Sequence, residues 1–159
     1  MGKKQVLIVL LFITTLFIVA GCTETGGKKG IETYFSGLNS ESNYLISPNS
    51  FVKMLEANSS EVYLLDIRKK EDYHKGHIPS AEHCWWFDVD KIIPELPKDK
   101  TIVIYCYSGQ SAGQIVGVLR TAGYEAVSLT GGWNNGWKPY LEAQGDYTCP
   151  VCDKYQEIE

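Results

Sequence analysis

The fold is indicated most strongly by ten residues in the middle of the chain, TIVIYCYSGQ (101–110). The β-branched run 101–106 is typical of a buried strand, and the turn-forming residues 97–100 come directly before it. Residues 107–110 suit a tight connection. Beyond them, apolar residues recur at helical spacing until Gly123, at Ile115, Val116, Val118 and Leu119. We therefore expect a strand that ends at Cys106, then a loop, then a helix.

The flanking sequence repeats this alternation of strands and helices. Compact runs predict strands at 62–67, 81–87 and 125–129, and helices are expected at 51–55, 69–76, 89–96 and 133–143. Capping residues at 47–50 precede the first helix, and Pro94 should make the last turn of the third irregular. Strands separated by helices form a parallel sheet covered on both faces, because each crossover lies on the sheet. The expected fold class is α/β.

The N-terminus has the features of a targeting segment. Lys3 and Lys4 precede an uncharged apolar run, 6–20, that is shorter than the roughly 20 residues of a membrane-spanning helix. The run ends in VAGC (19–22), which resembles the lipobox of prokaryotic lipoproteins, whose cysteine is acylated. The resemblance implies a lipid anchor on Cys22 and a protein on the extracytoplasmic side of the cell membrane. An ordinary signal peptide, or an uncleaved signal anchor with a chance cysteine, is the alternative.

These observations divide the chain into four segments. We expect a lipoprotein signal peptide at 1–21, a lipidated cysteine and flexible tether at 22–44, one folded domain at 45–145, and a tail at 146–159. The formal net charge is −4, and removal of Lys3 and Lys4 would make it more negative. Because no basic stretch is suited to a phosphate backbone, nucleic acid is not expected as a partner.

Cys106 has the position of a reactive cysteine. Ligands of open α/β sheets bind beyond the carboxyl ends of the strands, where a loop leads into the next helix. A sulfur at this position would face free N–H groups and the positive end of the helix that begins near Gly109. Both features favour thiolate over thiol.

Four motifs of the chain resemble the rhodanese family in order and spacing. They are LDIR (65–68), YHKGHIPSA (73–81), CYSG (106–109) and LTGGW (129–133). The resemblance spans most of residues 45–145. It implies a five-stranded parallel sheet with helices on both faces, and a cysteine that alternates between free thiolate and persulfide.

The same resemblance implies roles for individual residues. Cys106 would be the nucleophile that takes sulfur from a small donor molecule and passes it to a thiol or another nucleophile. The loop Tyr107, Ser108, Gly109, Gln110 and Ser111 would hold the persulfide anion, and Gly109 suits a tightly curled backbone. Asp66 and Arg68 would support the loop. No metal and no organic cofactor is implied.

The loop departs from the family pattern at its sixth position. Well-studied members that use thiosulfate usually carry arginine there, whereas this chain has Ser111 beside the neutral Gln110. A missing positive charge weakens the attraction of thiosulfate, so a thiol persulfide or a polysulfide is the better-suited donor. It also counts against a phosphatase or arsenate reductase of the same fold, since phosphate is clamped by arginine. A catalytically inactive binding or redox-sensing module is the main alternative function.

The remaining cysteines have several possible roles. Cys149 and Cys152 form a CPVC pair beyond the rhodanese motifs, which suits a disulfide, a redox pair that accepts sulfur from Cys106, or half of a metal site. A metal site would need more ligands, such as His83 or a second chain. Cys84 is expected in the core.

Several aromatic and histidine residues have structural interpretations. His77 is expected in a turn with local hydrogen bonds rather than as a catalytic base. One of Trp85 and Trp86 should enter the core, while the other covers a helix or lines the rim near the loop. Trp133 and Trp137 should share a helix face and pack.

Overall fold

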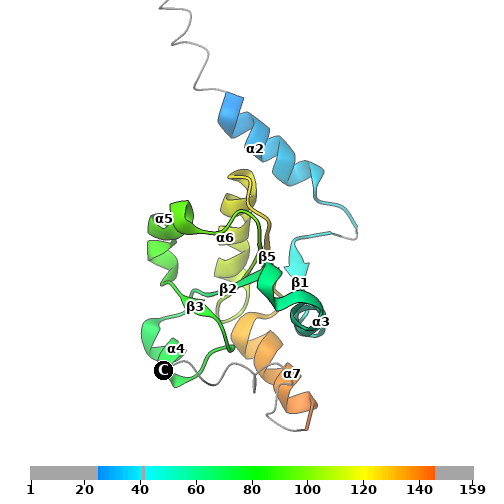
Figure 1. Cartoon of the computed structure of the whole chain (residues 1–159), viewed down its shortest axis with the longest axis vertical. Coiled ribbons are helices and arrows are strands. Elements are labelled where there is room, and N and C mark those ends of the chain that lie inside the picture. The colour runs from blue at the N-terminus through cyan, green and yellow to red at the C-terminus, as the bar shows by residue number, and fades with distance from the viewer. Residues whose placement is uncertain (1–24, 41, 146–159) are drawn as a thin grey trace, which may run out of the picture.

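The computed structural model describes residues 25–40 and 42–145. Within these ranges, five strands form one parallel sheet in the order β1-β5-β4-β2-β3 (Figure 1). The strands are β1 (Leu45–Ile46), β2 (Val62–Asp66), β3 (Glu82–His83), β4 (Thr101–Tyr105) and β5 (Ala126–Leu129). The α-helices are α2 (Thr25–Ser36), α3 (Pro48–Asn58), α4 (Lys70–Lys75), α5 (Val89–Ile92), α6 (Gln110–Thr121) and α7 (Lys138–Ala143). Shorter helical turns are η1 (Ser59–Glu61), η2 (Trp86–Asp88), η3 (Ile93–Glu95) and the π-helical η4 (Gly132–Trp137).

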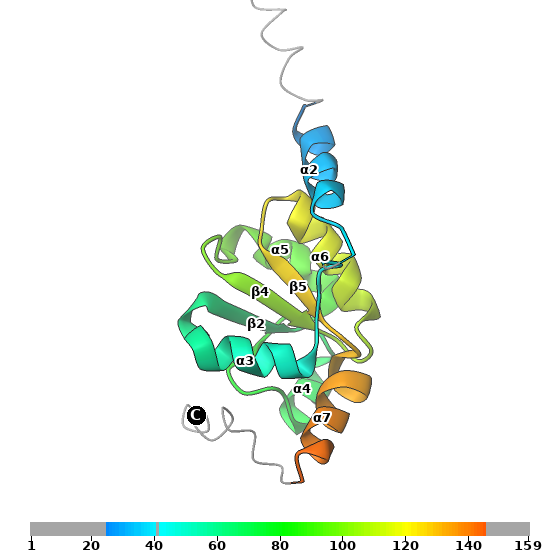
Figure 2. The same ribbon diagram turned by 90° about the vertical axis from the view of Figure 1, so that its right-hand side faces the viewer.

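Strand β4 is central because it pairs with β2 on one side and β5 on the other. Its residues alternate between two apolar clusters: Ile102 and Ile104 face the cluster that includes α5 and α6, whereas Val103 and Tyr105 face the cluster that includes α3 and Trp137. Figures 1 and 2 show the same layers, with α5 and α6 on one side of the sheet and α3 on the other. The predicted α/β class, parallel sheet and two-sided helical cover are therefore confirmed.

Most of the predicted elements are present with small shifts of their ends. Ser47 caps α3, since its hydroxyl oxygen accepts from the N–H of Ser50 at 3.1 Å. Pro94 ends the regular part of the α5 region, and the chain continues as the 3-10 turn η3. The helix predicted at 133–143 begins as the π-helical η4 and becomes α-helical at Lys138.

The strand predicted at 81–87 is mostly wrong. Only Glu82 and His83 pair with β2, and the chain then bends into η2. Trp86, which is half-buried, packs against the core, and Trp85 lines a separate cleft beside the start of α4. Of the aromatic residues that looked like strand formers, Trp86 thus packs on the core while Phe87 is exposed.

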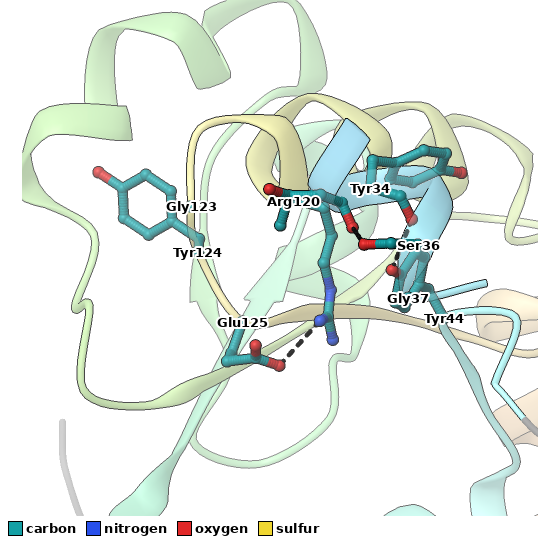
Figure 3. A pocket seen from close by; sticks show the side chains of 9 residues that line it. Tyr34, Ser36, Gly37, Tyr44, Arg120, Gly123, Tyr124 and Glu125 are labelled. Carbon is teal, nitrogen blue, oxygen red and sulfur yellow. Dashed lines mark hydrogen bonds and ion pairs between the residues drawn. The ribbon is translucent and has the colours of Figure 1, made fainter. Parts of the chain in front are cut away.

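The segment 22–44, predicted as a flexible tether, contains a helix that was not predicted, because residues 25–36 form α2. This helix packs against α6, and a Cβ atom added to Gly30 would collide with the carbonyl oxygen of Thr121. Figure 3 shows the seam: Tyr44 donates its hydroxyl to the Tyr34 carbonyl oxygen at 2.8 Å, and the Arg120 guanidinium lies 4.2 Å from the centre of the Tyr44 ring. Tertiary contact therefore outweighs the low helix propensity of glycine.

None of the helices in the described ranges has the length and apolar character to cross a bilayer. The segment 1–21, Cys22 and the tail 146–159 lie outside the described residues.

Candidate active site

Cys106 follows β4 at the carboxyl edge of the sheet, and its side chain lies at the bottom of the loop that leads to α6. The residue is only 4% exposed. The backbone N–H of Gly109 donates to the Cys106 Sγ over 3.1 Å. Gly109 has a φ of 89°, which turns the chain back over the sulfur before α6 begins at Gln110. The sulfur therefore lies within hydrogen-bonding distance of a backbone N–H at the start of α6.

The loop is held from outside by the start of η4. The N–H of Trp133 donates to the carbonyl oxygen of Cys106 at 2.8 Å, and the N–H of Asn134 donates to that of Tyr107 at 2.9 Å. These bonds turn the loop carbonyls outward. The carbonyl oxygen of Gly109 accepts from the Ser128 hydroxyl at 3.3 Å.

Gly132 allows this close approach. Its φ is 57°, and a Cβ atom added to it would lie 2.5 Å from the Cys106 carbonyl oxygen and 2.7 Å from the Gly109 nitrogen. The residue belongs to the LTGGW motif, but the sequence indicated only a turn there. A pair of glycines that begins two positions after the last residue of a strand was the available signal.

Tyr107 connects the loop to α4. Its hydroxyl donates to Asp72 Oδ2 at 2.6 Å and accepts from the N–H of Lys69 at 3.2 Å. The bond from Tyr107, followed by one from Lys75, lowers the pKa of Asp72, while burial and the bond to Asp72 raise the pKa of Tyr107. Sequence reasoning missed this contact, because the two residues are 35 positions apart.

Asp66 and Arg68 form a buried ion pair at the end of β2, with Nη2 of Arg68 2.7 Å from Oδ2 of Asp66. The same Nη2 donates to the Gly76 carbonyl oxygen at 2.7 Å. The guanidinium lies 4.2 Å from the centre of the Trp133 ring, and Trp133 in turn bonds to Cys106. Arg68 thus contacts the ring of Trp133, whose backbone N–H bonds to the loop, so one residue lies between the Asp66–Arg68 pair and Cys106.

The other loop residues supply no charge. Ser108 and Gln110 are exposed, and Ser111 is half-buried in the first turn of α6. All six residues from 106 to 111 lack a basic side chain. Any anion held by the loop itself would therefore be bound by backbone N–H groups.

Both histidines considered in the sequence make local contacts. Nδ1 of His77 lies 3.0 Å from the Tyr73 carbonyl oxygen, and the His77 ring stacks on that of Tyr73 with 3.8 Å between ring centres. Nε2 of His83 lies 2.8 Å from the Arg68 carbonyl oxygen. The local hydrogen bond predicted for His77 is present.

Cys84 lies in the core, as predicted, and burial raises the pKa of its thiol. It and Cys106 are free thiols. In the described ranges, no three His, Cys, Asp or Glu side chains come together as a metal site. Cys22, Cys149 and Cys152 lie outside the described residues.

Trp137, 1% exposed, and the half-buried Trp133 belong to the same side of the core. Trp137 packs edge-to-face against Phe51, whereas Trp133 stacks on Tyr105 and on Arg68. The two tryptophans therefore join the core to the active-site loop.

The described residues thus define the class of the protein: a parallel α/β sheet with a cysteine in the loop between its central strand and the next helix. Comparison with known families identifies the family. The sequence pattern of the Rhodanese-like domain matches residues 47–138, and the chain belongs to this family.

Individual relatives agree with this assignment. A sulfurtransferase of Allochromatium vinosum is 33% identical over 93 residues, which cover 56% of this chain and 87% of that protein. The thiosulfate sulfurtransferase GlpE of Coxiella burnetii is 28% identical over 81 residues, with 50% of this chain and 75% of that protein covered. The solution structure of the rhodanese-like domain of the Anabaena protein Alr3790 has a TM-score of 0.54 and 31% identity, and covers 62% of this chain and 76% of that one. These relatives support sulfur transfer in general.

Proposed function

We propose that this protein is a sulfurtransferase that carries sulfane sulfur as a persulfide on Cys106. The supporting observation is the N–H of Gly109, which points at Sγ from 3.1 Å at the start of α6. A persulfide anion on Cys106 would extend into the same loop and accept from its amides. Such preorganised donors stabilise charge without any rearrangement of the protein.

The chemistry is a double displacement that needs no cofactor. The Cys106 thiolate attacks the outer sulfur of a donor R–S–S⁻, a new S–S bond forms, and R–S⁻ leaves with the electron pair of the broken bond. An acceptor thiolate then attacks the terminal sulfur of Cys106–S–S⁻, which returns Cys106 to the thiolate. Sulfur is moved between thiols, and the two half-reactions together involve no net oxidation.

The neutral loop favours a thiol persulfide over thiosulfate. Thiosulfate carries two negative charges close to the reacting sulfur, and residues 106–111 offer no cation to offset them. A thiol persulfide carries a single negative charge on its outer sulfur. We expect persulfide donors to load Cys106 faster than thiosulfate does.

Intact-protein mass spectrometry of a form that starts after Cys22 tests the proposal. The reduced protein is treated with a thiol persulfide or with thiosulfate, beside Cys106→Ser and the control Cys84→Ser. We expect a gain of one sulfur in the wild type and in Cys84→Ser, and none in Cys106→Ser. The absence of any gain in folded wild type with a free Cys106 would refute the proposal and favour a binding or sensory module.

We also propose that Cys22 carries lipid and holds the domain on the extracytoplasmic side of the membrane. The support is the VAGC motif after a basic start and an apolar run. Full-length protein expressed in a bacterium with radioactive palmitate should incorporate label and fractionate with membranes, whereas Cys22→Ser should lose the label. Label retained in Cys22→Ser would contradict the anchor.

A further inference from the structure

A cleft of about 420 Å³ lies against the outer side of the active-site loop. We call it the lysine cleft, because Lys75 and Lys138 stand at its border. Its described lining consists of Arg68, Asp72, Lys75, Gly76, Tyr107, Trp133, Asn134 and Lys138. The volume falls in the range of small-molecule sites.

The lysine cleft adjoins the loop that begins at Cys106. Tyr107 follows Cys106 directly and lines the cleft, and its hydroxyl reaches Asp72 on α4. Trp133 and Asn134, which line another side, donate their N–H groups to the carbonyl oxygens of Cys106 and Tyr107. A molecule in the cleft therefore lies beside the loop that holds the sulfur.

The charges of the cleft leave a positive excess. Arg68 is paired with the buried Asp66, and Lys75 lies 3.0 Å from Asp72. Lys138 is exposed, and within the described part of the chain its side-chain ammonium has no hydrogen bond or ion pair, although its backbone N–H donates to the Trp133 carbonyl oxygen. Asp72 has a lowered pKa and is ionised at neutral pH. With Arg68 neutralised by Asp66, the charged side chains left in the cleft are therefore Lys75, Lys138 and Asp72, and their sum is positive. The net charge of the whole chain is negative, so a positive cleft differs in sign from the protein as a whole.

We propose that the lysine cleft binds the carboxylate of a small thiol, or of its persulfide, while the sulfur end of that molecule reaches Cys106. This inference rests on the proposed sulfurtransferase function and adds the class of substrate. Lys138 would form the ion pair and Lys75 would add to the field, so the cleft would supply the cation that the loop lacks at Ser111. Because the carboxylate lies away from the sulfur, the charge is recognised without crowding the reaction.

The transfer step is the second half-reaction described above. The thiol first loses its proton to water, its sulfur attacks the terminal sulfur of Cys106–S–S⁻, and the electron pair of the broken bond stays on Cys106. The carboxylate takes no part in the bonds that change. Recognition of the carboxylate should therefore increase the apparent affinity for the thiol and leave the maximal rate of transfer nearly unchanged.

The experiment compares two acceptors of nearly equal size, 3-mercaptopropionate and its neutral amide, 3-mercaptopropionamide. Protein loaded with sulfur on Cys106 is mixed with each acceptor at concentrations well below saturation, where the rate reports the apparent affinity, and the loss of sulfur is followed by mass spectrometry. Rates are expressed per thiolate, because the thiolate is the nucleophile. The variants are Lys138→Gln and Lys138→Glu, with Lys53→Gln on the exposed side of α3 as the matched control.

We expect Lys138→Gln to slow transfer to the carboxylate by about two- to fivefold, the range of one partly exposed ion pair. Lys138→Glu should slow it further, and 0.5 M salt should reduce the difference between variants. Transfer to the amide should stay within twofold in all proteins. Equal rates for wild type and Lys138→Gln with the carboxylate, or an equal loss with both acceptors, would overturn the proposal.

This outcome is separate from failure of the proposed function. If Cys106 never gains sulfur, the sulfurtransferase proposal fails before an acceptor is added. If Cys106 gains sulfur and releases it to both acceptors without regard to Lys138, only the lysine cleft is refuted.

Discussion

Replacement of Gly132 by alanine should open the active-site loop, although this glycine does not touch the Cys106 sulfur. The new Cβ would lie 2.5 Å from the Cys106 carbonyl oxygen, 2.7 Å from the Gly109 nitrogen and 2.9 Å from the Ser108 nitrogen. All three are backbone atoms, so η4 and the loop must separate. The separation would break the bonds from Trp133 and Asn134 to the loop carbonyls.

The magnitude follows from two contributions. A left-handed conformation costs a residue with a side chain about 1–2 kcal/mol, and two lost hydrogen bonds cost about 1 kcal/mol each, which gives roughly 3–4 kcal/mol. Urea unfolding measures this loss, and the rate of sulfur loading on Cys106 measures the effect on the loop. If the Gly109 amide is displaced, the sulfur loses one hydrogen-bond donor. We therefore expect the rate of sulfur loading to fall by about tenfold or more.

Gly113→Ala is the matched control, because this glycine lies in α6 close to the same loop and a Cβ added there meets nothing within 4 Å. It should be neutral or stabilising by up to about 1 kcal/mol, since alanine is the better helix former. If the unfolding free energy of Gly132→Ala lies within about 0.5 kcal/mol of the wild-type value, as for an ordinary surface substitution, and sulfur loads at the same rate, the reasoning about close backbone approach is wrong.

Two further predictions concern α4 and α2. Because the bond from Tyr107 lowers the pKa of Asp72, the carboxylate contributes stability that is complete above its ordinary pKa near 4 and is lost as the pH falls through the lowered value. The difference in unfolding free energy between wild type and Asp72→Asn should therefore be present at pH 7 and decrease as the pH falls below about 4. A difference independent of pH would contradict this. Gly30→Ala should displace α2 from α6 and destabilise the protein by about 1–3 kcal/mol, as overpacking does, whereas Gly26→Ala, which meets nothing within 4 Å, should not. Hydrogen exchange of the α2 amides would measure the displacement, and equal exchange in both variants would argue against a docked helix.

The sequence predicted those elements whose signals are local. The β-branched run of β4 and the Ser47 cap of α3 depend on residues within one segment, and both were found. The edge strand β3 was overestimated, because aromatic residues at 85–87 suit a strand and also suit the cover of a sheet edge. Periodicity does not distinguish these two uses.

Contacts between distant residues explain what the sequence did not reveal. The glycines of α2 predict no helix by local propensity. The helix packs closely on α6 at Gly30, beside the backbone of Thr121, which lies some ninety positions later in the sequence. The bond from Tyr107 to Asp72 and the close approach of Gly132 have the same origin. The roles assigned to Cys106, Asp66 and Arg68 came from the rhodanese resemblance, and they stay predictions until the variants are measured.

Helix α2 packs at the end of the domain opposite the Cys106 loop. Its residues Gly30 and Tyr34 lie beside Thr121 and Gly117 of α6, so the two helices run in opposite directions. The N-terminus of α6 carries the Cys106 loop, whereas its C-terminus meets the first half of α2 (Figure 2). Twelve residues of α6 span about 18 Å. Any attachment of the chain on the N-terminal side of Thr25 would therefore approach the end of α6 that lies farthest from the Cys106 loop.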